Sequence, residues 1–341
     1  MSTLIEKIDN GPIRYGSATN IGCGHENQDN LFVWISPDIQ IFGMLDGHSS
    51  KNGKHASQFA KDFCEKFIPT NYNLFIENSH EFIKQLFAGA NQAIKEGLKI
   101  MYPNFTEIND ILYYINGFPI DGGSTFTLII IHNRKVFVAN VGDSSIISCT
   151  QSKEACELNS DHSPENISEF KRIKTIDPTV KFIYDGKNKP DLFRINPETD
   201  EPEITGLVQF YKNVRKEAGT LVKKEINNHK DEYIMLTMTR VLGDFALKPG
   251  VTSEPEINEY SLDELFGESI GAFVLATDGL WDNWRFEDVS KFVMDESCLN
   301  VLPNVQMITD ALMERNTIYA NRNFPGQCDD VSIIVIFVNL K

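Results

Sequence analysis

Three short strand-forming segments follow one another so closely that they constrain the fold more than any other feature of the chain. They span 125–131, 136–141 and 145–149, with joins of four and three residues between them. The segments are rich in β-branched residues, which favour strands. Parallel neighbours need a crossover of about a dozen residues or more. The sequence therefore predicts three antiparallel strands that form a meander.

The remaining chain alternates blocks of strands with blocks of helices. Further strands are predicted at 31–35, 39–45, 233–238, 272–277 and 331–338. Amphipathic spacing predicts helices at 56–67, 81–100, 287–294 and 305–319, and a polar helix that begins near Pro164 with Ser163 as its N-cap. This order does not alternate strand and helix as a doubly wound sheet does. It predicts an α+β fold, an antiparallel sheet with flanking helices.

The segment 177–232 has no sustained hydrophobic period and contains four prolines. It is interpreted as a long irregular insertion. The strand at 331–338 is expected to return to the central sheet. A single domain over 12–341, with this insertion, is therefore expected.

The net charge of −16 bears on partners and location. An acidic chain repels nucleic-acid phosphates and anionic lipid, so neither partner is expected. No apolar run approaches the roughly 20 residues of a membrane span, and no signal peptide is recognised. The six cysteines form no Cys-x-x-Cys pair and are interpreted as free thiols of a reducing compartment. An intracellular protein, cytoplasmic or nuclear, is expected.

Acidic motifs recur next to the predicted strands. Four are found: Asp46-Gly47-His48, Gly142-Asp143, Asp278 to Asp282, and Asp329-Asp330. A single aspartate at a strand end is usually a turn residue, and the acidic excess can also be a solvated surface. Four such motifs favour a site of hard oxygen ligands, which suits Mg²⁺ or Mn²⁺. Zinc is disfavoured, since no His/Cys cluster has zinc-site spacing.

Two such ions could lower the pKa of a bridging water and hold a phosphate oxygen, the logic of two-metal hydrolysis. His48 follows Asp46 by two residues and could protonate a leaving alkoxide as a general acid. The alternative for His48 is a purely structural role.

Further motifs accompany these in a fixed order. They are Asn27-Gln28-Asp29, Gly123-Ser124-Thr125, Ala139 to Ser144, Asp161-His162, Thr239 to Asp244, and Glu254-Pro255-Glu256. Together with the acidic motifs they resemble the metal-dependent serine/threonine phosphatases of type 2C, the PPM family. The resemblance runs from about residue 20 to residue 338.

The resemblance implies two packed antiparallel sheets with helices on both outer faces. It implies a monomeric enzyme that hydrolyses phosphoserine and phosphothreonine in phosphoprotein substrates. A hydroxide that bridges two metal ions would attack phosphorus directly, with no phospho-enzyme. Asp46 would bridge the ions and His48 would be the general acid.

The resemblance also implies the other ligands of Mg²⁺ or Mn²⁺. The Gly47 carbonyl would bind one ion, and Asp278 and Asp329 would complete the shell of the second. Asp143, with Asp278 or Asp282, would hold a third and weaker ion. Asp29 would bind metal-bound water, and Gln28 could only contact water.

One departure from the family pattern concerns the substrate phosphate. Many members carry an arginine at the position of Gly24. The guanidinium group that could donate two hydrogen bonds to the substrate phosphate is therefore absent at that position. Lys51 or Lys54 is hypothesised to supply the positive charge, although both could be solvated helix-face lysines. The insertion at 177–232 lies where the family has its flap; it either shapes substrate choice or is a tolerated surface insertion.

Three functions remain open at this point. The leading one is the Mg²⁺- or Mn²⁺-dependent protein phosphatase, because the chain retains Asp46, Asp278 and Asp329. The second is a catalytically weak or inactive phosphatase-like scaffold that binds partner proteins, which the missing arginine favours. The third is a hydrolase of small phosphoesters or nucleotides, for which no Walker-type loop gives support.

Overall fold

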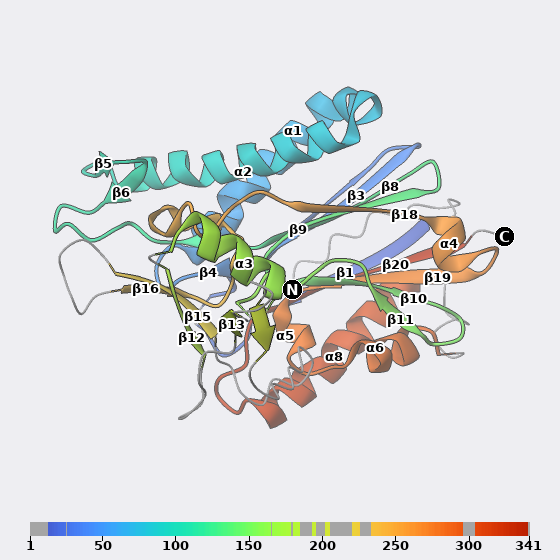
Figure 1. Cartoon of the computed structure of the whole chain (residues 1–341). Coiled ribbons are helices and arrows are strands. Elements are labelled where there is room, and N and C mark those ends of the chain that lie inside the picture. The colour runs from blue at the N-terminus through green and yellow to red at the C-terminus, as the bar shows by residue number, and fades with distance from the viewer. Residues whose placement is uncertain are drawn as a thin grey trace.

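Two five-stranded antiparallel sheets form the centre of the molecule (Figure 1). The computed structural model describes residues 13–24, 26–164, 166–178, 180–184, 193–195, 202–204, 220–225, 233–295 and 304–339. One sheet has the order β1 (Ile13–Asn20), β20 (Val331–Asn339), β19 (Ile270–Ala276), β10 (Ser145–Cys149) and β11 (Ala155–Glu157). The other has the order β18 (Glu256–Ser261), β9 (Lys135–Val141), β8 (Phe126–His132), β3 (Ile39–Leu45) and β2 (Asn30–Ile35).

The sheets pack because their strands are apolar on both faces. In β20, Ile334 and Ile336 lie in the core between the sheets, together with Phe42 of β3. Their neighbours Val335 and Phe337 lie on the opposite face, in the core that the helices cover. This two-residue alternation is that of a strand buried on both sides.

Long helices cover each outer face (Figure 1). Helices α1 (Gly53–Glu77) and α2 (Ser79–Met101) lie over the β8 sheet. Helices α5 (Asp278–Trp281), α6 (Phe286–Val293) and α8 (Val305–Asn323) pack on the β20 sheet. A short helix, α4 (Leu262–Phe266), connects β18 to β19. The predicted fold, two antiparallel sheets with helices on both outer faces, is confirmed.

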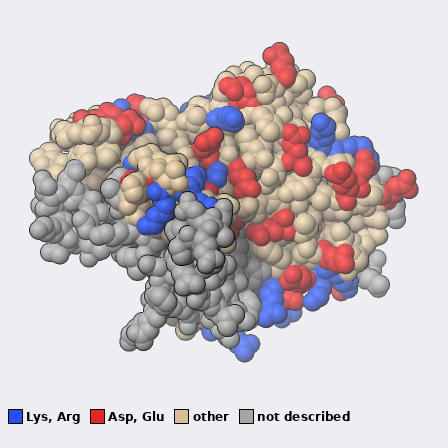
Figure 2. Space-filling model, in the orientation of Figure 1, with Lys and Arg blue, Asp and Glu red and all other residues tan. Residues whose placement is uncertain are grey.

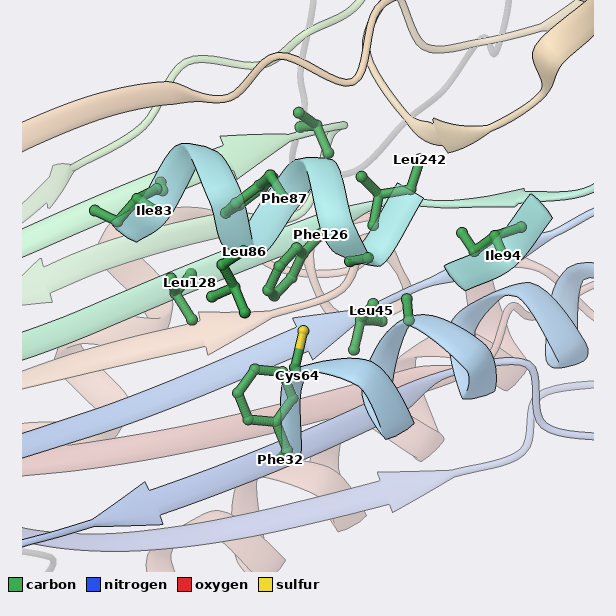
Figure 3. Packing of buried hydrophobic residues seen from close by; sticks show 14 of the residues in the cluster. Phe32, Leu45, Cys64, Ile83, Leu86, Phe87, Ile94, Phe126, Leu128 and Leu242 are labelled. Atoms are coloured by element: carbon green, nitrogen blue, oxygen red, sulfur yellow. The ribbon is translucent and has the colours of Figure 1, made fainter. Parts of the chain in front are cut away.

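The core under α1 and α2 is built from large side chains (Figure 3). The rings of Phe87 on α2 and Phe126 on β8 are stacked with their centroids 4.2 Å apart. Leu86 and Cys64 are fully buried beside them. Burial of a leucine or phenylalanine side chain stabilises the fold by about 2 kcal/mol. This packing holds α1, and the loop that precedes it, against the end of β3.

The predicted meander is correct for its first two strands and wrong for the third. β8 and β9 pair antiparallel, but β10 pairs with β19 and β11 in the other sheet. The chain changes sheets at Gly142, where φ is +117° and an added Cβ would lie 2.6 Å from the Thr125 side chain. A join of three residues therefore crosses between the sheets, and Asp143 lies at the crossing.

The helix predicted to begin near Pro164 begins three residues later, as α3 (Ile167–Ile176). Its N-cap is Asn166, whose side chain accepts a hydrogen bond from the Ser168 amide. The predicted cap, Ser163, instead accepts a turn hydrogen bond from the Asn166 amide through its carbonyl. The competing asparagine three residues downstream is the better cap.

The interpretation of 177–232 as wholly irregular is wrong for its described part. Its backbone contains β12 (Lys181–Tyr184), β13 (Phe193–Ile195), β14 (Pro202–Ile204) and β15 (Thr220–Glu225). β12 and β15 form a sheet with β16 (Tyr233–Leu236), so the strand predicted at 233–238 belongs to this small sheet. The rest of the segment lies outside the described residues.

Several short elements position the loops at one end of the sheets. A hairpin of β5 (Thr106–Ile108) and β6 (Ile111–Tyr113) follows α2. A small sheet joins β17 (Leu242–Gly243), β7 (Gly123–Ser124) and β4 (Gly47–His48), and the 3₁₀ turn η1 (Phe245–Leu247) follows it.

The surface charges, the cysteines and the helices bear on the expected partners and location of the protein. Figure 2 shows Asp and Glu side chains distributed over the visible face and interspersed with Lys and Arg. The five described cysteines are free thiols, while Cys298 lies outside the described residues. Within the described part of the chain, no helix has both the length and the apolar character that crossing a membrane requires.

Candidate active site

An acidic pocket of about 640 Å³ opens at one end of the two sheets. Six carboxylates line it: Glu26, Asp46, Asp143, Asp278, Asp329 and Asp330. His48 and the backbone of Gly47 also line it, whereas no described lysine or arginine does. A pocket of this composition has a strong negative potential and attracts cations.

The sheet topology explains why these acids meet. β3 and β9 flank β8, and both end beside its first residues, with Met44 paired to Thr127 and Val141 paired to Phe126. Asp46 follows the end of β3 directly, and Asp143 follows the end of β9 after Gly142.

In the other sheet, Ala276 at the end of β19 pairs with Ile333 near the start of β20. Asp278 after β19 and Asp329 before β20 therefore lie at the same edge. Antiparallel pairing thus brings together residues that are about 50 positions apart in the chain.

Asp46 is the electrostatic centre of this group. Burial, the largest cause, raises its pKa well above the ordinary range, and the charges of Asp29, Asp278, Asp329 and Asp143 raise it further. The backbone of Asp46 is fixed by Thr125, whose hydroxyl accepts from the Asp46 amide at 3.0 Å. Buried like charges of this kind require protons or cations.

Asp29 adds a second buried carboxylate. Burial raises its pKa to about 7, against the effect of the nearby Ser332 and Thr277 hydroxyls, which lower it. The Thr277 hydroxyl donates to Oδ2 at 3.0 Å, while Oδ1 is buried and has no hydrogen-bond partner among the described residues. An unsatisfied buried carboxylate oxygen has a high desolvation cost, which a cation or an ordered water could offset.

His48 is paired with Asp244, a residue not singled out as functional in the sequence. His48 Nε2 lies 2.5 Å from Asp244 Oδ2. Burial lowers the pKa of His48, but the charge and hydrogen bond of Asp244 outweigh it, and the pKa is raised above its ordinary value. Asp244 also accepts a hydrogen bond from the Gly122 amide at 3.3 Å. The only sequence signal for Asp244 was its place at the end of the motif Thr239 to Asp244.

Asp330 organises the loops around the pocket, and this role was also missed. Its two carboxylate oxygens accept hydrogen bonds from the amides of Gly22 and Gln28, both at 2.8 Å. The Gln28 side chain donates to the Ser49 carbonyl at 3.2 Å. Hydrogen bonds thus hold the Asn27-Gln28-Asp29 loop to the segment directly before β20 and to the loop after β4.

Gly47 occupies a position that only glycine fits. An added Cβ would lie 2.3 Å from the Gly53 carbonyl oxygen and 2.7 Å from that of Gln28. The close approach of three backbone segments explains the glycine directly after Asp46.

Other predicted site residues lie outside the pocket lining. Asp282 ends α5, where its amide donates to the Asp278 carbonyl at 2.7 Å. The Lys51 ammonium lies 5.7 Å from the centre of the Tyr114 ring, and Lys54 forms an ion pair with Glu26 at 2.9 Å. Neither lysine lines the pocket, and the phosphate-binding role of Lys51 stays a prediction.

The donor set fits a hard divalent cation. Carboxylates and a glycine backbone line the pocket, and burial together with the charges of neighbouring acids raises the pKa values of Asp29 and Asp46. Among the described residues, no three acidic, His or Cys side chains converge into a compact ion-binding group. Mg²⁺ commonly takes one or two carboxylates and keeps several waters.

Comparison with known proteins gives a consistent picture. A family model described as "Protein phosphatase 2C" matches residues 41–188 and 211–320. A rice (Oryza sativa subsp. japonica) protein named "Probable protein phosphatase 2C 56" is 27% identical over 250 residues, which are 73% of this chain and 51% of that protein. "Protein phosphatase 1L" from Bos taurus is 25% identical over 264 residues, or 75% of this chain and 55% of that protein. The chain therefore spans about half the length of these relatives.

Solved structures show the same fold. A serine-threonine phosphatase 2C from Toxoplasma gondii superposes with a TM-score of 0.64 at 15% identity, over 96% of this chain and 95% of that one. The catalytic domain of the phosphatase PstP, solved with two manganese ions, gives a TM-score of 0.52 at 16% identity, over 96% and 98% of the two chains.

Proposed function

This chain belongs to the protein phosphatase 2C family, and from that premise we propose that it is a Mg²⁺- or Mn²⁺-dependent enzyme that hydrolyses phosphoserine and phosphothreonine in proteins. The observation that carries the proposal is the buried Asp46, whose pKa is raised by burial and by the charges of other pocket acids. A cluster of buried acids remains fully ionised only when cations are bound to it. An inactive phosphatase-like scaffold, the alternative function, would not need this cluster of buried acids.

In this proposal Asp46 would hold both metal ions, and the Gly47 carbonyl would bind one of them. Asp278 and Asp329 would complete the ligands of the second ion. When bound, the ions would polarise the phosphoryl oxygens and lower the pKa of the attacking water. Support comes from the lining of one pocket by all four residues.

Three further acids have subsidiary roles in the proposal. Asp143, with Asp278 or Asp282, would hold a third and weaker ion. Asp29 would accept a hydrogen bond from metal-bound water through Oδ1, its oxygen without a described partner.

His48 is proposed as the general acid that protonates the leaving alkoxide of serine or threonine. Asp244 holds the imidazole through Nε2 and favours its protonated form. With Nε2 engaged, Nδ1 is the ring nitrogen left to donate to the leaving oxygen. An alkoxide is a poor leaving group, so proton donation to it is worth a large rate factor.

Binding of the substrate phosphate would depend on the metal ions, because no described lysine or arginine lines the pocket. Lys51 remains a proposed auxiliary group that would leave the Tyr114 ring to reach the phosphate. An unchanged KM for a phosphopeptide in Lys51→Ala would contradict that role.

We further propose that residues 12–341 form one catalytic domain that acts as a monomer. The segment 177–232 would shape the choice among phosphoproteins, since the described residues Thr237 and Met238, which follow it, line the pocket. If deletion of 187–224 leaves relative rates on several phosphoproteins unchanged, that role is wrong.

The test of the proposed function is hydrolysis of a phosphothreonine peptide by the purified protein. Turnover is expected with Mn²⁺ or Mg²⁺ and none with EDTA. Metal binding by calorimetry without turnover would instead favour the scaffold.

A further inference from the structure

Cys23 and Cys328 lie opposite each other, just beyond the ends of two paired strands. The β1–β20 ladder pairs Ile13 with Val338 and ends with Asn20 paired to Val331. Continued by three residues, the same register places Cys23 opposite Cys328. The Cys23 amide donates a hydrogen bond to the Cys328 carbonyl at 2.8 Å, so these two residues face each other beyond the end of the ladder.

This placement suits a disulfide. Directly opposite residues of an antiparallel pair have Cα atoms about 4.5–5.5 Å apart, within the roughly 4.4–6.8 Å that disulfides span. In a regular antiparallel pair the side chains of such facing residues also leave the backbone on the same face. Interaction with the Cys23 thiol is the largest cause that raises the pKa of the Cys328 thiol above its ordinary value. Both cysteines are free thiols in the structure.

One cysteine of the pair is accessible to solvent, and the other lines the acidic pocket. Cys23 is exposed to solvent, whereas Cys328 is partly buried, lines the acidic pocket and directly precedes Asp329. The backbone around Cys23 packs tightly on that of Asp329, since a Cβ on Gly22 would lie 2.3 Å from the Asp329 carbonyl. A covalent bond between the two segments would therefore act on the peptide that carries Asp329.

We propose that Cys23 and Cys328 form a reversible disulfide on reaction with a hydroperoxide, and that the oxidised protein is a slower phosphatase. The effect on activity rests on the proposed function, whereas formation of the disulfide does not. No other pair of the described cysteines lies on facing segments beside the pocket.

The chemistry balances with hydrogen peroxide as the oxidant. The exposed Cys23 sulfur, as thiolate, attacks the O–O bond, takes one oxygen as a sulfenic acid and releases water after protonation. The Cys328 sulfur then attacks the Cys23 sulfur, the S–S bond forms, and the sulfenic oxygen leaves as a second water. Two thiols lose two electrons in total, and the peroxide gains them. A small thiol reverses the reaction by exchange.

A loss of activity follows from the position of Asp329. The S–S bond fixes the two sulfurs at about 2.05 Å, so the segment that carries Cys328 and Asp329 is restricted to the geometry that the bond allows. Disturbance of groups that orient metal ligands typically costs 10–100-fold in activity or metal affinity. We expect a loss of about tenfold in turnover, with weaker Mn²⁺ binding.

The experiment uses the full chain as wild type, Cys23→Ser and Cys156→Ser. Cys156 is also exposed but lies on β11, so its variant is the matched control. Each protein is treated with hydrogen peroxide, alkylated and digested, and the peptides are identified by mass spectrometry. Turnover of a phosphothreonine peptide and Mn²⁺ affinity are measured before oxidation, after it, and after addition of dithiothreitol.

The proposal expects a linked Cys23–Cys328 peptide in wild type and in Cys156→Ser, with a loss of turnover that dithiothreitol restores. Cys23→Ser should form no such link and keep its turnover under the same treatment. Absence of the linked peptide from oxidised wild type would overturn the disulfide, and a link without a change in turnover would overturn its regulatory effect. If the reduced protein does not hydrolyse the peptide, the proposed function fails, while the mass spectra and Mn²⁺ affinity still decide the disulfide and its effect on the site.

Discussion

His48 Nε2 lies 2.5 Å from Asp244 Oδ2, although 196 residues separate the two in the chain. The small sheet of β4, β7 and β17 brings them together, because His48 pairs with Gly123 and Gly123 pairs with Gly243. An added Cβ on Gly123 would lie 2.3 Å from Asp244 Oδ2 and 2.8 Å from His48 Nε2. The glycine between them is what lets the two side chains meet.

Asp244→Asn should lower kcat for a phosphothreonine peptide by about 10²-fold or more, since general acids contribute roughly 10²–10⁴-fold. The reason is that the uncharged amide no longer favours the protonated imidazole. An aryl phosphate has a good leaving group and needs little proton donation, so its kcat should fall far less. Steady-state kinetics on the two substrates measure the difference.

Glu259→Gln is the matched control for that variant, because it alters an exposed His–carboxylate pair, His80 with Glu259 at 2.6 Å. Its kinetics should equal those of wild type. Equal losses on both substrates in Asp244→Asn would show that the pair does not act through proton donation.

Glu169→Gln should destabilise the fold by about 3 kcal/mol, the typical cost of breaking a buried ion pair from one side. Only 2% of the Glu169 side chain is exposed, and it accepts hydrogen bonds from Arg172 and Arg240, both at 2.7 Å. The variant would leave two guanidinium groups without their shared carboxylate. Chemical denaturation measures the change, with Asp288→Asn, which alters an exposed pair with Lys291, as the near-neutral control. Similar losses in both variants would contradict the buried role.

The Glu169 carboxylate also makes the stability of the fold depend on pH. Despite burial, which raises it, the hydrogen bonds from Arg240 and Arg172 lower the pKa of Glu169 to about 2, from an ordinary value of 4.5. The unfolded chain then binds more protons than the folded one between these values, so the Glu169 contribution is complete above pH 4.5 and is lost as the pH falls toward 2. Unfolding followed from pH 6 to pH 3 should show a shallower loss of stability in Glu169→Gln than in wild type. Parallel curves would exclude Glu169 as a source of the acid sensitivity.

Asp46→Asn should have opposite effects with and without metal. Without metal it should stabilise the protein, because it removes a buried charge that the surrounding carboxylates oppose. Mn²⁺ should raise the Tm of wild type, with about 2.7 kcal/mol gained at a concentration 100 times Kd, and should raise that of the variant much less. Thermal unfolding with Mn²⁺ and with EDTA measures both effects. A variant that is less stable without metal and keeps the full Mn²⁺ shift would contradict the assignment of Asp46.

The sequence was sufficient to predict the architecture because most strands and helices carry strong local patterns. β3 was predicted with its observed bounds, Ile39–Leu45. β1 and β18 were missed, since neither has a continuous apolar run and their side chains are mostly half-buried. The separation of β9 and β10 into different sheets was also missed. A three-residue join is compatible with a hairpin, and only the pairing of β10 with β19 and β11 places it in the other sheet.

Four of the six pocket acids, Asp46, Asp143, Asp278 and Asp329, were predicted because each lies next to a strong strand or in a recognisable motif. Asp244 and Asp330 were not predicted as functional, since their roles depend on pairing between distant segments. Strands of two residues such as β4, β7 and β17 leave no periodic signal. The position of the Lys51 ammonium over the Tyr114 ring is likewise a product of tertiary packing.

The most direct test of the central claim is the initial rate of phosphothreonine peptide hydrolysis with Mn²⁺ for wild type, Asp278→Asn and Asp288→Asn. Asp278 lines the acidic pocket, whereas Asp288 is exposed on α6 and serves as the matched substitution. The account predicts metal-dependent turnover in wild type and Asp288→Asn, and a rate in Asp278→Asn that is lower by about 10²-fold or more. Full activity in Asp278→Asn, or turnover in wild type that persists in EDTA, would contradict it.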